Sequence, residues 1–475
     1  MPYLSSPGLD TDEFSIDIVT FALDGPKNYD KSSKPLYIEA EDTSRFLTCH
    51  QTIQLTRRLI AGFKHVGLQP GDRVLVHLPS TYIYSSIIFG IIGAQGIYVA
   101  SNPAYRLFEL NHLFEHARPA LIITTTHLRS VILEAANAQS IPHKSIIVLD
   151  TENLRVEDHL AACAPIPLRL DNDDGTSSGH PFENLLGYGE DDWHRITSPE
   201  MLHNTHAAMF PTSGTTAMPK LAVFSHFGLM GELRAIFSVC ERQVTRLMSL
   251  PLFLKYGFLM GHIPTVRWGS PMYITQRFKM DTFVAGVRDY HITELTLVPA
   301  MIVGMLRGVE HQVLKQAFTS VRVVNVGGGT LDKSTFDAFR KLFHEDAQIA
   351  HGYGLSETGP LTITQSHGAE SIGTIGAAFP GIEIKLVNEH GRTITEDGVP
   401  GIAWCRSSCA FVGYIDVKGK ITTPIDDQGW FCTGDVLSWK GQDLCFVGRS
   451  KELIKVNRYV YDAQFLYHCS EHADE

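Results

Sequence analysis

The chain has 475 residues, 44% of them hydrophobic, and a formal net charge of −11. The length suits about three domain-sized units and the hydrophobic fraction can fill a sizeable core, so we expect a globular protein. The net negative charge and the lack of a Lys/Arg run argue against nucleic acid as the main partner, because binding to a phosphate backbone needs clustered positive charge.

The two ends of the sequence and its cysteines bear on location. The residues after Met1 include Pro, Ser, Asp and Glu instead of a basic region and an apolar run, so we expect no secretory signal. The chain ends Ala473-Asp-Glu475, without the Ser-Lys-Leu peroxisomal address. The eight cysteines are scattered without a Cys-x-x-Cys pair, which is typical of reduced thiols and not of a disulfide framework or a zinc site. We therefore expect a cytoplasmic protein.

The first part of the chain alternates between helical and extended patterns. Apolar residues recur at helical spacing from Thr48 to Val66, and a turn with Gly and Pro leads into the strand Arg73–His77. The stretch from Thr81 to Ala100 carries no charge and is long enough to cross a bilayer, but polar residues and glycines interrupt it, which favours a buried core helix. Further helices and strands follow as far as Leu149. This alternation predicts a mostly parallel, doubly wound sheet.

Residues 171–180 form the most loop-like decapeptide of the chain, rich in Asp, Ser and Gly. We expect this segment to join two α/β lobes. Its aspartates suggest calcium, but the Gly and Glu positions of an EF-hand loop are absent, so a linker is favoured.

The stretch Phe210-Pro-Thr-Ser-Gly-Thr-Thr-Ala-Met-Pro-Lys220 consists mainly of hydroxylated residues, Gly, Pro and Lys. It predicts a strand, a phosphate-binding loop and a second strand, with a helix that begins near Ser225. Glycine lets backbone N–H groups converge on an anion, hydroxyl groups donate hydrogen bonds, and Lys220 supplies a point charge. Such clusters are more often simple surface turns, so the interpretation depends on the motifs that follow.

Three later motifs carry related chemistry. The strand Val321–Val326 runs into Gly327-Gly-Gly329, where a flat group can lie against the backbone. The decapeptide His351-Gly-Tyr-Gly-Leu-Ser-Glu-Thr-Gly-Pro360 holds Glu357, a hard oxygen ligand suited to Mg²⁺. The segment Gly429-Trp-Phe-Cys-Thr-Gly-Asp435 places a carboxylate at a tight turn, which suits the two donors of a vicinal diol.

Together these motifs resemble those of the adenylate-forming superfamily, which comprises acyl-CoA ligases, peptide-synthetase adenylation domains and luciferases. Residues 213–220 follow its signature Ser-Gly-Thr-Thr-Gly-x-Pro-Lys except at Ala217, and residues 351–360 follow the family pattern almost throughout. The resemblance covers about residues 30–460. Within the superfamily, the chain is similar to 4-coumarate-CoA ligase.

The resemblance implies an α/β fold with two doubly wound lobes and a small β-barrel-like subdomain. The short alternating apolar runs after Ser371 agree with this β subdomain. The AMP-binding large domain would occupy residues 1–447. Within it, the first lobe would end near residue 180, the second lobe with the phosphate loop would span 181–370, and the β subdomain would span 371–447. Residues 448–475 would be the hinge and the remnant of a C-terminal small domain that is largely missing, together with the late Lys that contacts substrate in relatives.

The resemblance also implies roles for individual residues. Lys220, Ser356 and Glu357 would be catalytic, with Glu357 as the Mg²⁺ ligand and the Ser356 hydroxyl on the α-phosphate, and Lys451 would be the hinge residue. ATP would be bound by Thr212, Ser213, Gly214, Thr215, Thr216, Gly327, Gly328, Gly329, His351, Gly352, Tyr353, Asp435 and Arg449. The acid would be surrounded by Phe253, Tyr256, Gly354, Pro360 and Leu361.

Two neighbouring positions bear on the acid pocket. Leu254 stands where relatives carry His or an aromatic residue. Lys255 could pair with a second carboxylate on the substrate, but a side chain that points into solvent is favoured, because Lys is rarely buried.

The implied reaction is the ATP-dependent activation of a carboxylic acid. The carboxylate attacks the α-phosphate of Mg·ATP, pyrophosphate leaves, and CoA then displaces AMP from the acyl-adenylate. The implied cofactors are therefore ATP, Mg²⁺ and CoA, and we expect no membrane span. Two alternatives stay open: a truncated pseudoenzyme or incomplete module that binds ATP or acyl-AMP without efficient turnover, and an adenylation domain that serves a carrier protein.

Overall fold

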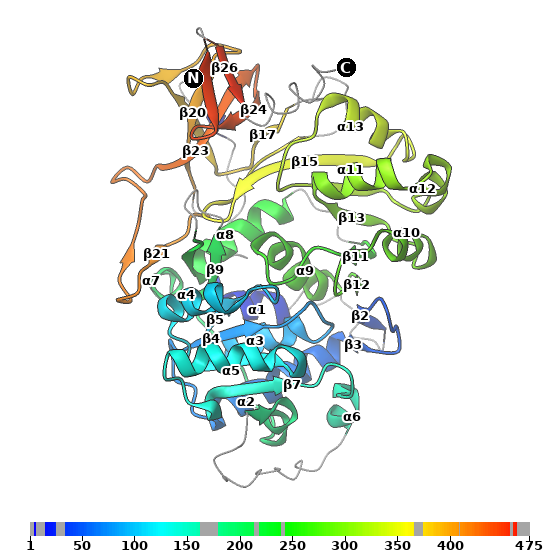
Figure 1. Cartoon of the computed structure of the whole chain (residues 1–475), viewed down its shortest axis with the longest axis vertical. Helices are drawn as coiled ribbons and strands as arrows, with labels where there is room; N and C mark the ends of the chain where they lie inside the picture. The colour runs from blue at the N-terminus through cyan, green and yellow to red at the C-terminus, as the bar shows by residue number, and fades with distance from the viewer. Residues whose placement is uncertain are drawn as a thin grey trace.

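The structure is a computed structural model, and it describes residues 4–5, 15–24, 34–161, 179–212, 218–238, 243–364, 374–407, 409–456 and 459–462. Within these residues, two nine-stranded sheets and one six-stranded sheet form the framework. Helices cover the two large sheets, and the small sheet, drawn in orange and red, lies at one end of the molecule (Figure 1). The predicted α/β class with an added β subdomain is confirmed.

The first large sheet has the order β22-β21-β10-β9-β5-β4-β6-β7-β8. Its central strands β5, β4, β6 and β7 are parallel, as the alternating pattern predicted. The strands are β4 Arg73–His77, β5 Ile97–Ala100, β6 Leu121–Thr125, β7 Ile146–Leu149, β8 His180–Pro181, β9 His206–Thr212, β10 Lys220–Ser225, β21 Gly413–Ile415 and β22 Ile421–Thr422. The helices of this part are α2 Cys49–His65, α3 Tyr84–Gly93, α4 Leu107–Ala117, α5 Arg129–Ala138, α6 Val156–Ala161 and α7 Pro199–Asn204.

The strands on either side of the predicted phosphate loop belong to this first sheet. β9 pairs in parallel with β5, with Ala208 opposite Tyr98, and β10 returns antiparallel to β9. We expected the phosphate loop to belong to the second lobe, but the strands that flank it belong to the first sheet. The expected lobe boundary near residue 180 therefore does not separate the two sheets. The reason is that the buried run 207–210 packs beside β5. A linker composition marks where a connection lies, but it does not say which sheet edge the next strand joins.

The second large sheet has the order β17-β16-β15-β14-β13-β11-β12-β2-β3. Its strands from β2 to β15 along this order are parallel. They are β2 Pro35–Glu39, β3 Phe46–Thr48, β11 Arg246–Met248, β12 Met272–Ile274, β13 Glu294–Leu297, β14 Val323–Val326, β15 Gln348–Leu355, β16 Gly359–Ile363 and β17 Ala377–Ala378. The remaining helices are α1 Ile18–Leu23, α8 His226–Phe237, α9 Lys255–Trp268, α10 Met280–Asp289, α11 Pro299–Gly308, α12 His311–Ala317 and α13 Lys333–Arg340.

The third sheet is antiparallel and open. It has the order β1-β18-β20-β23-β24, with β19 paired to β18. Its strands are β1 Leu4–Ser5, β18 Glu383–Val387, β19 Thr393–Ile394, β20 Gly401–Arg406, β23 Phe431–Lys440 and β24 Asp443–Arg449. The edge strands β1 and β24 do not pair with each other, and closure would need longer, staggered edges than a two-residue strand provides, so the barrel-like expectation is corrected to an open sheet. A hairpin of β25 Leu453–Val456 and β26 Tyr459–Asp462 follows.

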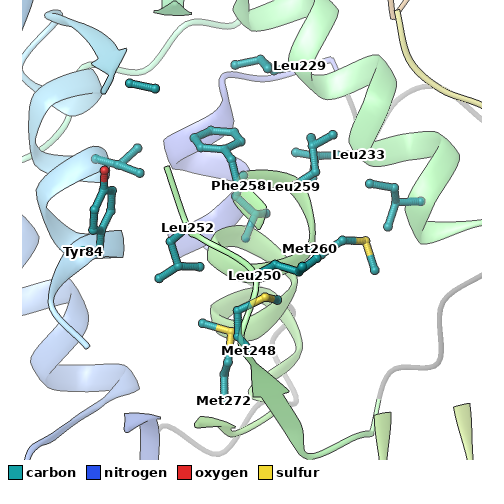
Figure 2. Packing of buried hydrophobic residues seen from close by; sticks show 14 of the residues in the cluster. Tyr84, Leu229, Leu233, Met248, Leu250, Leu252, Phe258, Leu259, Met260 and Met272 are labelled. Atoms are coloured by element: carbon teal, nitrogen blue, oxygen red, sulfur yellow. The ribbon is translucent and has the colours of Figure 1, made fainter. Parts of the chain in front are cut away.

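Helix α9 lies in the middle of the molecule and is buried over almost its whole length. Figure 2 shows Phe258 of this helix with Tyr84 of α3 on one side and Leu229 and Leu233 of α8 on the other. Helix α3 is itself fully buried, which confirms the predicted core helix. Among the described residues, no helix is long and apolar enough to cross a membrane.

Candidate active site

Two cavities lie beside the carboxyl ends of the parallel strands β13, β14 and β15. The larger one, which we call the groove, has a volume of about 980 Å³ and is lined by these strand ends, the β9–β10 hairpin and the third sheet. The smaller one, which we call the inner cavity, has a volume of about 230 Å³ and is lined by α9, β14, β15 and β16. Gly328 and the segment Gly352–Ser356 line both, so this segment is their common wall. Crevices at the carboxyl ends of parallel strands are the usual ligand sites of open α/β sheets.

Thr212 and Lys220 stand opposite each other at the end of the β9–β10 hairpin, where both line the groove. The predicted loop residues Ser213, Gly214, Thr215 and Thr216 lie outside the described residues. The Lys220 side chain is exposed, and its Nζ lies 4.7 Å from the centre of the Tyr414 ring. The Thr212 hydroxyl is buried near Tyr414 but makes no hydrogen bond of good geometry with a described residue. The hairpin end therefore presents a cation and a hydroxyl donor to the groove, as an anion site requires.

Glu357 lies between β15 and β16, and Tyr414 holds its carboxylate. The Tyr414 hydroxyl donates a hydrogen bond of 2.6 Å to Oε1 of Glu357. The Glu357 carbonyl accepts the Phe411 backbone N–H at 2.8 Å, which fixes the same turn. Burial, reinforced by the Glu357 carboxylate, raises the pKa of Tyr414, so its hydroxyl keeps its proton and remains a donor.

The Glu357 carboxylate fits a Mg²⁺ ion that arrives with a nucleotide. Mg²⁺ is usually held by one or two carboxylates together with substrate phosphates and waters. In the part of the chain that the structure describes, no cluster of three or more His, Cys, Asp or Glu side chains could hold a metal by itself. Glu357 lines the same groove as Lys220 and Thr212, so a carboxylate, a cation and a hydroxyl group share one space.

A second cluster in the groove is built around Asp435. The Tyr353 hydroxyl donates to Oδ2 of Asp435 at 2.8 Å, and Nε of Arg449 lies 3.5 Å from Oδ1. Asp435 and Arg449 are partners in the pairing of β23 with β24. Burial raises the pKa of Asp435, while the hydrogen bond from Tyr353 and the charge of Arg449 oppose this rise. Tyr353, which the sequence alone did not connect with Asp435 and Arg449, thus joins them in one cluster, and the predicted hinge residue Lys451 lines the same groove.

The glycine triplet forms the turn after β14, and its neighbours leave little room for side chains. A Cβ on Gly327 would lie 3.1 Å from the Tyr256 ring, and Gly328 has a φ of +76°, which favours glycine. His351 binds the Gly329 carbonyl through Nε2 at 2.8 Å. His351 itself lines neither cavity, and its contact with this site is the hydrogen bond to the glycine turn.

The predicted acid pocket corresponds in part to the inner cavity. Its lining includes three of the five predicted residues, Tyr256, Gly354 and Pro360. Phe253 and Leu361 line neither cavity. Leu361 is 1% exposed and faces the core, because side chains alternate along β16 and its neighbours Pro360 and Thr362 take the cavity side.

Lys255 is buried and paired inside the protein, so the expectation of a solvent-pointing side chain was wrong. Its Nζ lies 2.7 and 2.6 Å from the two carboxylate oxygens of Glu232 on α8, and 3.9 Å from the centre of the Phe224 ring. The exposed fractions of the side chains are 7% for Lys255 and 0% for Glu232. Lys255 nevertheless lines the inner cavity.

Sequence reasoning missed three residues of this region. Tyr414 and Glu232 reach their partners from distant segments, and no local pattern connects them. Asn325, which lines the inner cavity, did have a signal, because it is a lone amide in the otherwise apolar end of the strand before the glycine triplet.

Comparisons with known proteins agree with this arrangement. The chain matches the family model of the AMP-binding enzymes over residues 28–415. It is 32% identical over 451 residues to a nicotinic acid-CoA ligase from Penicillium canescens, covering 94% of this chain and 80% of that protein. It is also 32% identical over 456 residues to a nicotinic acid-CoA ligase from Aspergillus fumigatus, covering 94% and 77%. ATP-bound MatB from Rhodopseudomonas palustris has the same fold, with a TM-score of 0.73 at 21% identity over 96% of this chain and 82% of that one. The chain therefore belongs to the AMP-binding enzymes of the adenylate-forming superfamily, among the acyl-CoA ligases.

Proposed function

We propose that the protein activates a small carboxylic acid with Mg·ATP and transfers its acyl group to CoA. The acid carboxylate attacks the α-phosphate and expels pyrophosphate, and the CoA thiol then attacks the acyl carbon and releases AMP. The observation that carries this proposal is the common wall Gly352–Ser356. An acid in the inner cavity and a nucleotide in the groove would meet at this wall, as an in-line attack on phosphorus needs.

The groove residues would position the nucleotide and balance its charge. Lys220 and Thr212 would face the phosphates from the hairpin end, together with Ser213, Thr215 and Thr216 of the loop. Ser356 would donate its hydroxyl to the α-phosphate from the wall. A Mg²⁺ ion held by Glu357 and phosphate oxygens would supply charge neutralisation. Because phosphoryl chemistry of this kind depends on positioning and charge, the protein needs no nucleophile of its own.

The Asp435 cluster would bind the ribose. A buried carboxylate with two oxygens can accept both hydroxyls of a vicinal diol, and charged acceptors make the stronger hydrogen bonds. Tyr353 and Arg449 would keep the carboxylate in place, since both contact it directly. The ring of Tyr353, which lines the groove, would pack against the adenine.

For the acid, we propose a small aromatic compound. Relatives at 32% identity are named nicotinic acid-CoA ligases. An apolar cavity of about 150 Å³ holds a benzene molecule, so the inner cavity of about 230 Å³ suits one ring with a short substituent. A 4-coumarate-like acid, which has one ring and a short side chain, belongs to the same class.

We keep the domain division as part of the proposal. Residues 1–447 would form the AMP-binding large domain, and residues 448–475 would begin the small domain, with Lys451 at the hinge. The scattered cysteines also agree with a reducing compartment, and we propose a cytoplasmic enzyme.

The test is a panel of aryl, fatty and dicarboxylic acids, each incubated with Mg·ATP and CoA, with pyrophosphate and acyl-CoA measured together. We expect acid-dependent pyrophosphate release and a thioester with aryl acids. Lys220→Ala should lower the rate about 10²–10³-fold, by comparison with the loss of one preorganised donor in other active sites. ATP binding without acid-dependent pyrophosphate release from any acid would contradict the proposal, and pyrophosphate release without acyl-CoA would reassign the thiol acceptor.

A further inference from the structure

The polar groups of the inner cavity restrict which acid it can take. The described residues of the lining are mainly glycines and apolar side chains, and Lys255 is the only one of these described residues that carries a charge. A ligand in a cavity of this kind is selected by shape and by the few polar atoms it meets.

The charge of Lys255 is already balanced within the protein. Both carboxylate oxygens of Glu232 lie within hydrogen-bond distance of its Nζ, and both side chains are buried. The Glu232 side chain is also locked against the chain turn before β16, because a Cβ on Gly359 would overlap its Cγ. A second carboxylate on the substrate would have to displace Glu232 and leave a buried charge unpaired, which is strongly unfavourable.

Among the described residues of the lining, Asn325 has a buried side-chain donor that is not used. It lies on β14, where the strand register puts Thr296 and Ala350 beside it. Its Nδ2 is buried and makes no hydrogen bond with a described residue, whereas Thr362, another polar residue of the lining, donates its hydroxyl to the Ile375 carbonyl. Ala350, the partner of Asn325 on β15, also lines the cavity, so a small side chain lies next to the amide there. A buried donor without an acceptor is costly, and a ligand that supplies the acceptor removes that cost.

We infer that Asn325 selects the substrate by donating a hydrogen bond to a neutral acceptor on the acyl group, such as a ring nitrogen. The substrate class is then a one-ring monocarboxylic acid that carries such an acceptor, and acids with a second carboxylate are excluded by the Glu232–Lys255 pair. This inference rests on the proposed function, because only that function assigns the inner cavity to the acid.

The experiment compares benzoic acid with its three pyridinecarboxylic analogues, which have the same shape and replace one CH by a nitrogen. Binding of each acid is measured by calorimetry in the presence of a non-hydrolysable ATP analogue, above neutral pH, with the wild-type chain and with Asn325→Leu. We expect the wild type to bind at least one pyridine acid about 10- to 100-fold more tightly than benzoic acid. In Asn325→Leu this ratio should fall to about one, through weaker binding of the pyridine acid.

Two further variants separate recognition from general damage. Met260→Leu changes the apolar lining at similar volume, and it should leave the ratio unchanged. Asn325→Ser keeps a hydrogen-bond donor at this position in a smaller side chain. For every variant, unchanged binding of the ATP analogue reports that the protein is folded. Equal binding of all four acids by the wild type, or a ratio that persists in Asn325→Leu, would overturn the inference. Turnover is measured separately. Acid-dependent pyrophosphate release together with equal binding of the four acids would contradict this inference alone. Selective acid binding without pyrophosphate release would contradict the proposed function alone.

Discussion

The hydroxyl of Tyr414 lies 2.6 Å from Oε1 of Glu357, across a sequence separation of 57 residues. Tyr414 belongs to β21, which lies between the edge strand β22 and β10 in the first sheet, whereas Glu357 follows the last parallel strand of the second sheet. One hydrogen bond therefore ties the two large sheets together at the residue we propose for Mg²⁺. Nζ of Lys220 lies over the ring of the same tyrosine, 4.7 Å from its centre.

Removal of this hydroxyl should weaken the use of Mg²⁺. In Tyr414→Phe the Glu357 carboxylate loses its donor, and loss of a partner that orients a metal ligand typically costs 10–100-fold in metal affinity or activity. We expect the Mg²⁺ concentration for half-maximal pyrophosphate release to rise by about this factor. Tyr273→Phe, in a stacked pair with Tyr290 away from both cavities, is the matched control and should behave as wild type. An unchanged Mg²⁺ dependence in Tyr414→Phe would show that Glu357 does not need the tyrosine.

The Asp435 cluster predicts sugar selectivity. If Asp435 accepts both ribose hydroxyls, the wild type should bind ATP about 10- to 100-fold more tightly than 2′-deoxy-ATP, since hydrogen bonds to a charged group contribute about 1.5–3 kcal/mol. Asp435→Asn should bind ATP more weakly and lose most of this preference. Asp443→Asn, in the same β23–β24 hairpin but outside the groove, is the control. Calorimetry measures the affinity of each protein for both nucleotides, and a preference for ATP that survives in Asp435→Asn would place the ribose elsewhere.

The buried pair Glu232–Lys255 predicts a stability pattern. Burial raises the pKa of Glu232 to about 7, against the opposing effect of Lys255. Lys255→Met leaves this carboxylate without its cation, so we expect a loss of about 3–5 kcal/mol in the free energy of unfolding. The loss should shrink below neutral pH, where the carboxyl takes up a proton. The double variant Glu232→Leu/Lys255→Met should recover most of the stability in urea unfolding, and a double variant no more stable than Lys255→Met would argue against a charge effect.

Most of the framework could be predicted because its signals are local. Ser225 precedes α8, and its side chain accepts the Gly228 backbone N–H at 3.2 Å, so the predicted start of that helix is confirmed. The strands β9 and β10 and the core helix α3 also follow from short stretches of sequence. Periodicity and turn chemistry act over a few residues, and these local signals were sufficient to predict the elements named here.

The parts that could not be predicted depend on contacts between distant segments. Lys255 looked exposed because its counter-ion, Glu232, lies on another helix. Leu361 was placed in the pocket by its neighbours in the motif, but the alternation of β16 turns it toward the core. The membership of β9 in the first sheet was missed for the same reason, since a linker does not encode the partner of the next strand.

Three buried histidines predict how stability depends on pH. Burial lowers the pKa of His77, His226 and His262 to about 4. Nδ1 of His262 lies 2.8 Å from the Ser85 hydroxyl and its Nε2 lies 3.1 Å from the Leu252 carbonyl, and this second contact opposes the lowering of the pKa by burial. The folded state thus binds fewer protons than the unfolded state, whose histidines have a pKa near 6.5, so this stability is complete above about pH 6.5 and is lost as the pH falls toward 4.

Each such histidine can account for about 3 kcal/mol across this range, because one pKa unit corresponds to about 1.36 kcal/mol. Urea unfolding at a series of pH values from 7.5 down to 5 should therefore show a free energy of unfolding that is level above about pH 6.5 and falls below it. His262→Gln should make the fall shallower, whereas His311→Gln, at an exposed position on α12, should leave it unchanged. A pH profile that is identical in His262→Gln and wild type would contradict the assignment of a buried neutral imidazole.

The most direct measurement is a single turnover without CoA. Excess purified chain is mixed with Mg·ATP and an aryl acid, quenched, and examined for acyl-adenylate by mass spectrometry, with Lys220→Ala in parallel. We place a nucleotide site in the groove and an acid site in the inner cavity, and the two meet at Gly352–Ser356. Acyl-adenylate and pyrophosphate should then appear in equal amounts in the wild type. In the variant both should form at a rate about 10²–10³-fold lower. Bound ATP that stays intact in the presence of every aryl acid would contradict the account.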